Sequence, residues 1–156
     1  MKKYLPLMVL ITLLGGFTQA APVAIDIALP PLTLQDQHAQ PWGLKADTRL
    51  VMFAAGRQPS NMVMEVLSNQ AKGFLESRQA VYVADMSRMP GFVTRNFALP
   101  ALREQPFVVG VNLDDQQLAD WPRQDNAITL IHLDAGRVSS IAYVRSTAEL
   151  KVALGL

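Results

Sequence analysis

The sequence predicts one α/β domain built on a mixed β-sheet. Apolar, β-rich runs of strand length alternate with segments of helical periodicity, and such β-α-β units place neighbouring strands parallel. A closing strand–turn–strand pattern adds an antiparallel edge. The chain has 156 residues, 50% of them hydrophobic and 17% charged, which suits a single packed core.

The first elements follow from local patterns. Alternating polarity near 32–35, turn residues at 36–40 and a return over 41–44 predict a β-hairpin after an extended lead-in over 22–31. The nearly continuous apolar run 49–55 predicts a strand covered on both faces. The helical spacing of Val63, Val66, Leu67 and Phe74 predicts a helix from Ser60 to Glu76 or Ser77.

The later elements follow in the same way. Strands are predicted over 80–85 and 107–113, with a short helix over 91–98 between them that Pro100 ends. The segment 114–124 is polar. Strands over 127–133 and 138–144 flank a turn with glycine at 136, and a Ser-x-x-Glu capping box at Ser146 starts the last helix.

The N-terminus has the pattern of an export signal. Two lysines precede a mostly apolar stretch from Leu5 to Leu14, and small residues lead to a predicted cleavage after Ala20. The apolar stretch is about half the roughly 20 residues that a membrane-spanning helix needs. The sequence therefore predicts a signal peptide over 1–20 and one periplasmic domain over 21–156, without membrane contact after cleavage.

Composition excludes several kinds of chemistry. The chain has no cysteine, so it has no disulfide, thiol nucleophile or thiolate metal site. Without Lys2 and Lys3 of the signal, 12 basic residues face 13 acidic ones, a formal charge of −1. A nucleic-acid partner is not expected, because no basic run would bind the phosphate backbone.

Three stretches carry a resemblance to a known superfamily: LPPLTLQDQHAQPWGL near the start, RLVMFAA before a loop and helix, and ITLIHLDAGRV near the end. In this order they resemble the thioredoxin-like superfamily, in its peroxiredoxin-like and periplasmic variants, over most of 32–154. The resemblance implies a three-layer sandwich, with a central mixed sheet, an N-terminal β-hairpin, and a C-terminal β-hairpin plus helix.

The superfamily's redox residues are missing from this chain. The Cys-Pro-x-Cys loop corresponds to Gln58–Asn61, in which Pro59 holds the place of the motif proline and two amides replace the thiols. The superfamily also has a cis-proline before the penultimate strand, a place that falls near Ala127 here. Thiol oxidoreductase and peroxidase activities are therefore excluded, and the sequence does not otherwise decide whether the protein is an enzyme.

Polar residues at the predicted strand ends form the candidate ligand-binding or partner-binding site. Ligands in open α/β sheets bind at the carboxyl ends of the strands, and a helix N-terminus favours an anion. The loop after 49–55 and the loop after 80–85 would share this rim if the two strands are neighbours. The candidate residues are Arg57, Gln58, Ser60, Asn61, Asp85 and Ser87. The competing interpretation is ordinary helix capping and solvated polar loops.

Other features favour structural roles. His38 and His132 stand far apart without other ligands, so no metal site is predicted, and no catalytic residue is assigned because neither histidine is placed to activate Ser87. The methionines are interpreted mainly as core, with Met62 and Met89 as possible members of the rim. Phe92 and Phe97 are expected to anchor their short helix.

The leading functional hypothesis is a non-redox periplasmic module that binds a protein or small ligand and needs no cofactor. The alternative is a binding protein for an anionic or flavin-like small molecule, or a non-thiol enzyme, that uses the rim near Arg57 and Asp85. No Gly-x-Gly-x-x-Gly follows a strand to support a dinucleotide. A third hypothesis is assembly through the free edge of the C-terminal hairpin or through the apolar rim.

Overall fold

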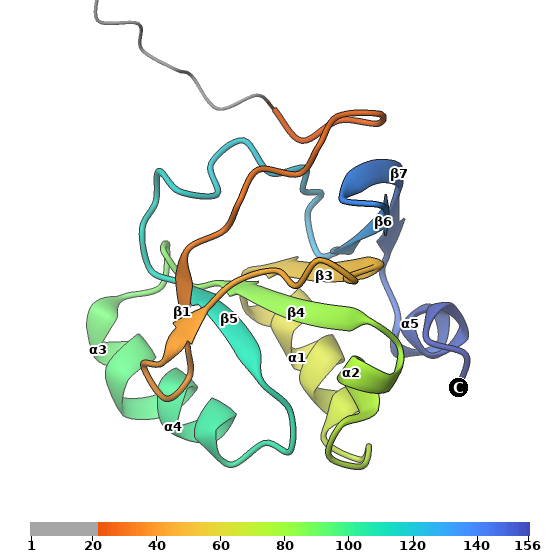
Figure 1. The fold of residues 1–156 in the computed structure, drawn as a ribbon. Coiled ribbons are helices and arrows are strands. Elements are labelled where there is room, and N and C mark those ends of the chain that lie inside the picture. The colour runs from red at the N-terminus through yellow and green to blue at the C-terminus, as the bar shows by residue number, and fades with distance from the viewer. Residues whose placement is uncertain (1–21) are drawn as a thin grey trace, which may run out of the picture.

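The computed structural model describes residues 22–156, so the predicted signal peptide lies outside the described residues. Figure 1 shows the order of the elements. In chain order they are β1 (Leu34–Asp36), β2 (Pro41–Trp42), β3 (Leu50–Ala55), α1 (Arg57–Leu67), α2 (Phe74–Ser77), β4 (Ala80–Asp85), α3 (Gly91–Val93), η1 (Thr94–Ala98), α4 (Leu99–Arg103), β5 (Val109–Asn112), β6 (Ile128–Asp134), β7 (Arg137–Val144) and α5 (Thr147–Ala153).

The strands form one seven-stranded sheet in the order β2-β1-β5-β4-β3-β6-β7. The central strands β3, β4 and β5 are parallel to one another, because helical crossovers connect them. The N-terminal hairpin and the C-terminal hairpin extend the sheet antiparallel on either side. The predicted α/β class, mixed sheet and both hairpins are confirmed.

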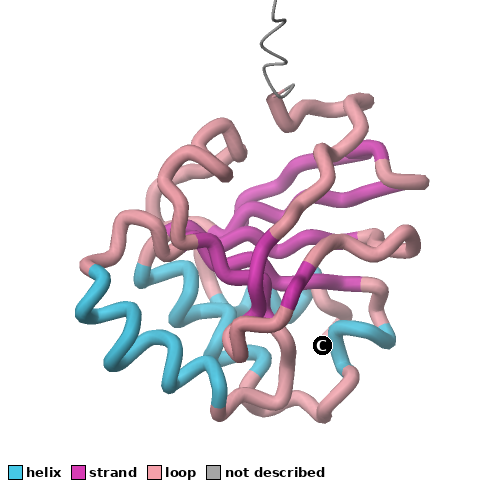
Figure 2. Tube along the Cα trace, turned by 60° about the vertical axis from the view of Figure 1, so that its left-hand side comes forward, coloured by secondary structure: helices cyan, strands magenta, loops and turns pink. Residues whose placement is uncertain are grey.

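The sheet separates a helical layer from a non-helical one. The described helices gather on one face, where Met52 and Tyr82 of the sheet pack with Val63 of α1 and Leu150 of α5 (Figures 1 and 2). The opposite face of β3 packs instead against Leu118 and Trp121 of the turn-rich segment after β5 and against Val23 of the lead-in. The third layer of the sandwich thus consists of irregular chain.

Helix α1 differs from its prediction at both ends. It begins at Arg57 rather than Ser60, because Gly56, at φ 102°, lets the chain turn directly from β3 into the helix. It ends at Leu67, and α2 begins only after Gly73, which adopts φ 86°. Residues 68–73 form a turn between the two helices, with Gly73 as the N-cap of α2, so the predicted single helix is in fact two.

The helical segment after β4 is longer than predicted and contains a π-helical turn. Gly91–Val93, Thr94–Ala98 and Leu99–Arg103 follow one another without a break, so Pro100 does not end the helix. Proline lacks an N–H, and its ring clashes with the carbonyl four residues earlier in a regular α-helix. The wider turn just before Pro100 accommodates this ring. Within residues 22–156, no helix is long and apolar enough to cross a membrane.

The lead-in segment pairs with the start of β7. The Val138 N–H donates to the Ile27 carbonyl at 2.9 Å, and the Val138 carbonyl accepts from the Asp26 N–H at 2.8 Å. Ala28 bridges Arg137 in the antiparallel sense. The first residues of this edge are therefore already covered, and only the later part of β7 is left for the predicted edge-to-edge assembly.

Candidate functional site

The rim predicted from the sequence lies at the carboxyl ends of the parallel strands. Ala55, the last residue of β3, pairs with Asp85, the last residue of β4, and Asp85 pairs in turn with Asn112 of β5. The chain segments that follow β3 and β4 therefore leave the sheet side by side. Residues 123–126, just before β6, close the same end.

These three segments enclose a cavity of about 640 Å³, here called the rim cavity. Its walls come from the start of α1, from the loop between β4 and α3, and from the segment before β6. The lining residues are Ala55, Gly56, Arg57, Gln58, Pro59, Asp85, Arg88, Met89, Pro90, Val93, Arg123, Gln124, Asp125 and Asn126. The structure thus brings Arg57, Gln58 and Asp85 together, because the strands β3 and β4 are neighbours.

Asp85 is the fixed polar centre of this cavity. Its side chain is 5% exposed and makes an ion pair with Arg123, with 2.9 Å between Oδ2 and Nη1. Its other oxygen, Oδ1, accepts hydrogen bonds from the Asn112 amide at 3.0 Å and from the Ser87 backbone N–H at 3.1 Å. A buried carboxylate needs such partners, because an unpaired one would be strongly destabilising.

Two effects compete in the pKa of Asp85. Burial raises it, because desolvation disfavours the charged form, but the hydrogen bonds from Ser87, Arg123 and Asn112 favour that form. The hydrogen bonds prevail, and the pKa of Asp85 lies below its ordinary value of 3.8. Asp85 is therefore ionised at neutral pH and suited to hold Arg123 rather than to act as a general acid.

Arg123 is the site residue that sequence reasoning missed. Its Nη2 donates to the Leu118 carbonyl, its Nε donates to the Trp121 carbonyl at 3.4 Å, and its guanidinium lies 5.1 Å from the centre of the Phe53 ring. These contacts fix the side chain against the third layer. No sequence motif marks Arg123, since it lies in irregular chain 38 residues from its partner.

The start of α1 differs from the expected capping arrangement. Gly56 is the N-cap and provides no side-chain bond, while the Ser60 hydroxyl donates to the Gly56 carbonyl at 2.8 Å. Pro59 has no N–H to offer. Ser60 and Asn61 lie outside the cavity lining, and Ser87 contributes its backbone N–H to Asp85. The anion-binding potential of this end thus comes from Arg57 rather than from a row of free N–H groups.

The cavity lining contains two further cations, Arg57 and Arg88, whose side chains are not held by other described residues. Arg57 and Arg88 are both exposed, and neither makes an ion pair or side-chain hydrogen bond with any described residue. The cavity lining contains no histidine, and the described residues hold no group of three His, Cys, Asp or Glu side chains. The arrangement is therefore suited to binding negatively charged groups, and it lacks a nucleophile with an adjacent base.

Tyr82 lies close to the rim, under the start of α1. Its side chain is completely buried, and among the described residues its hydroxyl has no hydrogen-bond partner. Burial raises its pKa to about 12, an effect that the nearby Ser60 hydroxyl opposes in part. The raised pKa keeps the Tyr82 hydroxyl neutral at physiological pH, so Tyr82 is a core residue and not a candidate base.

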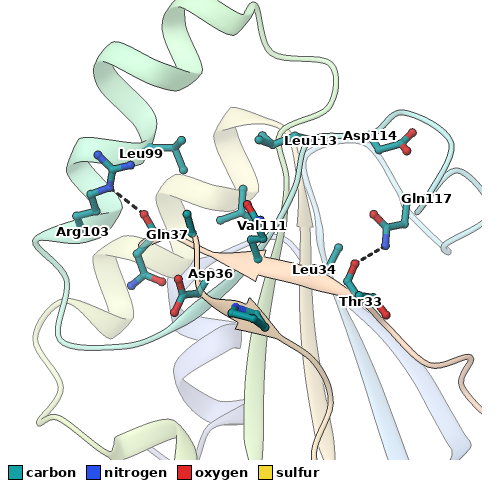
Figure 3. Close-up of a pocket in the computed structure, with 13 residues that line it drawn as sticks. Thr33, Leu34, Asp36, Gln37, Leu99, Arg103, Val111, Leu113, Asp114 and Gln117 are labelled. Atoms are coloured by element: carbon teal, nitrogen blue, oxygen red, sulfur yellow. Dashed lines mark hydrogen bonds between the residues drawn. The ribbon is translucent and has the colours of Figure 1, made fainter.

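A second cavity, of about 570 Å³, lies between β1, α4 and the segment after β5 (Figure 3). Its polar wall is occupied by internal bonds: Arg103 Nε donates to the Gln37 carbonyl at 2.8 Å, and Gln117 Nε2 donates to the Thr33 carbonyl at 2.8 Å. These bonds tie the first hairpin to its neighbours. The rim cavity is the better candidate because its cations are free.

No family model matches the chain, and no curated protein matches it. Solved structures do. A proposed thiol:disulfide interchange protein, DsbE, from Chlorobium tepidum is 14% identical, with a TM-score of 0.56 over 84% of this chain and 96% of that one. A proposed protein disulfide isomerase from Bacteroides thetaiotaomicron is 14% identical, with a TM-score of 0.55 over 85% and 87%. A proposed thioredoxin from Neisseria meningitidis is 15% identical, with a TM-score of 0.53 over 85% and 89%.

These identities support the fold and not the activity. The rim cavity occupies the strand ends where the resemblance places the redox loop, yet Gln58 and Asn61 stand in the places of the two thiols. The described residues also contain no cis peptide bond. The chain therefore has the thioredoxin-like fold, shared with thiol-dependent proteins, while itself carrying no cysteine.

Proposed function

We propose that this protein is an exported, non-redox binding module that recognises a protein or small ligand in the rim cavity. The observation that carries the proposal is the pairing of Asp85 with Arg123 in the cavity wall, beside two uncommitted arginines. A partly buried ion pair contributes little net stability, because the desolvation of the two charges offsets their attraction. It does, however, give a binding surface a fixed shape.

The position of the cavity supports the same conclusion. Open α/β sheets bind their ligands outside the carboxyl ends of the strands, and this cavity lies at the ends of β3 and β4. A protein without cysteine has no means of thiol exchange at that place. Binding is then the function that this end of the fold can still perform.

Export is part of the proposal and rests on the N-terminal pattern. Cleavage after Ala20 would leave a mature chain that enters the packed domain almost at once, because Val23 is buried against β3. The sheet needs no disulfide in an oxidising compartment, since apolar packing on both faces holds it together.

A small anionic molecule, flavin-like or other, is the second candidate ligand. Arg57 and Arg88 favour it because both are exposed in a cavity large enough for a small ligand. The absorbance spectrum of freshly purified protein separates the two candidates: a flavin-like band above 300 nm supports a bound chromophore, and a flat spectrum there favours a protein partner or a colourless ligand.

Native mass spectrometry of the protein, gently purified from its own periplasm, tests the proposal. The variant Arg57→Glu/Arg88→Glu reverses both free cations, and Glu at the first turn of α1 suits the helix dipole. The control Arg49→Glu/Lys72→Glu makes the same charge change away from the cavity lining. The proposal is supported if the wild type and the control carry a bound partner or ligand and Arg57→Glu/Arg88→Glu has lost it. A bare monomer in all three proteins contradicts it, as would turnover in insulin-reduction or peroxide assays.

A further inference from the structure

We infer that the occupant of this site is an acidic peptide segment with apolar side chains, bound jointly by the rim cavity and by an exposed aromatic ridge next to it. The aromatic ridge consists of Phe92, Val93 and Phe97. The inference rests on the proposed function and specifies the chemistry of its partner.

The two phenylalanines do not anchor their helix as expected. Phe92 is 64% exposed and Phe97 is 61% exposed, whereas Thr94 and Leu102 make the buried contacts of this helical segment. Their rings lie 5.9 Å apart, edge to face. Two large aromatic side chains that are mostly exposed and contact each other are typical of a surface that a partner covers.

The π-helical turn explains why the two rings meet. In a regular α-helix, residues five apart point in different directions, because each residue turns by about 100°. The π-helical turn over Thr94–Ala98 has i→i+5 hydrogen bonds and more residues in each turn, which brings Phe97 closer to the side of Phe92. Such turns are frequent at functional sites. The π-helical turn that accommodates Pro100 therefore also brings the two rings together.

The chain segment that carries the ridge has charged residues of one sign. From Met86 to Arg103 the chain carries Arg88, Arg95 and Arg103 and no acidic residue, although the whole chain has nearly equal numbers of both signs. The Arg95 guanidinium lies against Gly91, since a Cβ there would come within 3.3 Å of Nη1. In the cavity itself, the charges of Asp85 and Arg123 cancel. The remaining charged residues of the lining are two cations, Arg57 and Arg88, and one anion, Asp125.

Ridge and cavity are continuous. Val93 belongs to both, and Met89 and Pro90 line the cavity immediately before the helix begins. A bound segment can therefore pack an apolar side chain on the phenylalanines while a neighbouring carboxylate reaches Arg88 or Arg57. A flat anionic membrane would meet the ridge but could not fill the cavity. For this reason the structure favours a peptide over a lipid surface.

The test uses fluorescence polarisation with a labelled short peptide of alternating Glu and Leu. Two matched probes replace Glu by Lys or Leu by Ser. We expect the Glu/Leu peptide to bind and both matched probes to bind at least about tenfold more weakly. Binding should fall by about tenfold in Phe92→Ser/Phe97→Ser and in Arg88→Glu, and it should weaken with added salt.

Matched variants keep the test independent of folding. Val152 is 77% exposed on α5, so Val152→Ser removes an exposed apolar side chain elsewhere, and Arg49→Glu reverses a charge away from the cavity. Both should bind like the wild type. Circular dichroism and urea unfolding check that the ridge variants are folded, as expected for substitutions of exposed side chains.

Two results would overturn the inference. The first is equal binding of the Lys/Leu peptide, or no binding of the Glu/Leu peptide. The second is binding to vesicles containing phosphatidylglycerol that depends on the phenylalanines while the peptides stay unbound. If native mass spectrometry still shows an adduct that requires Arg57 and Arg88, the proposed function stands and only the peptide class fails. If neither peptide binding nor an adduct in native mass spectrometry is observed, the peptide class and the proposed function are both rejected.

Discussion

Arg123 and Asp85 are 38 residues apart in the chain, yet their side chains meet at 2.9 Å in the wall of the rim cavity. The contact joins the irregular third layer to the end of the central strand β4. Because Asn112 of β5 donates to the same carboxylate, three separate chain segments are held in one arrangement. The ion pair therefore fixes both the packing of the segment before β6 and the shape of the cavity.

Replacing Arg123 by Ala should lower the free energy of unfolding by about 2 kcal/mol, because Asp85 then keeps its burial but loses its counter-ion. The magnitude is moderate because the Arg123 side chain is 26% exposed. Urea unfolding at neutral pH measures the change. Arg88→Ala is the matched control in the same cavity, and it should alter stability by less than about 0.5 kcal/mol. Equal effects of the two variants would show that the ion pair does not hold the third layer.

Acid should remove the contribution of Asp85. The pKa of Asp85 is lowered in the folded protein, so its charged form stabilises the fold above the ordinary value of 3.8, and this contribution is lost as the pH falls through the lower folded-state pKa. Asp85→Asn should therefore be clearly less stable than wild type at neutral pH, with the difference shrinking as the pH falls below the ordinary value of 3.8. Urea unfolding of both proteins across this range is the measurement. A constant difference would assign the effect to packing rather than to charge.

How far the sequence predicts this site depends on how local each signal is. Two apolar runs predict the strands β3 and β4, and their parallel pairing brings Arg57 and Asp85 to one rim, as expected if the two strands are neighbours. Arg123 could not be predicted, because tertiary packing and not a periodic pattern sets the course of its segment. The prediction that Phe92 and Phe97 anchor their helix was also wrong, because both are exposed. Apolar residues in a short helix are expected to be buried unless the π-helical turn is known.

The helix boundaries show the same limit. Hydrophobic spacing predicts that α1 continues through Phe74, but α1 ends at Leu67 and a turn over 68–73 separates it from α2. The capping box at Ser146 is a local signal and is confirmed: its Oγ accepts from the Glu149 N–H at 3.1 Å. The capping box is read directly from four residues, whereas hydrophobic spacing alone does not indicate where α1 ends.

Tyr82→Phe should leave stability unchanged or raise it by up to about 1 kcal/mol, because it removes a buried hydroxyl without a partner. The pH dependence gives a sharper test. Because burial raises the pKa of Tyr82 from 10.0 to about 12, the wild type should lose stability as the pH rises from 10 towards 12. The variant should lack this component in urea unfolding at alkaline pH. A clear loss of stability in Tyr82→Phe at neutral pH would reveal a hydrogen bond to that hydroxyl.

Gly110→Ala should destabilise the first hairpin. A Cβ at Gly110 would come within 2.6 Å of Trp42 Cε3, so the indole would have to leave its place on β5. Overpacking of this kind costs about 1–3 kcal/mol. Urea unfolding measures the loss, and the double variant Gly110→Ala/Trp42→Leu should recover much of it by making space. If the smaller side chain at position 42 brings no recovery, the strain lies in the β5 backbone instead.

Photo-crosslinking in the periplasm shows whether the rim cavity recognises a partner or ligand without redox chemistry. A benzophenone amino acid is placed at Gln58, which lines the cavity, or at Lys151, an exposed residue of α5 outside it. We expect a discrete adduct, detected by mass, from position 58 alone, and its loss in Arg57→Glu/Arg88→Glu but not in Arg49→Glu/Lys72→Glu. Identical patterns from both positions, or an adduct indifferent to Arg57 and Arg88, would contradict it.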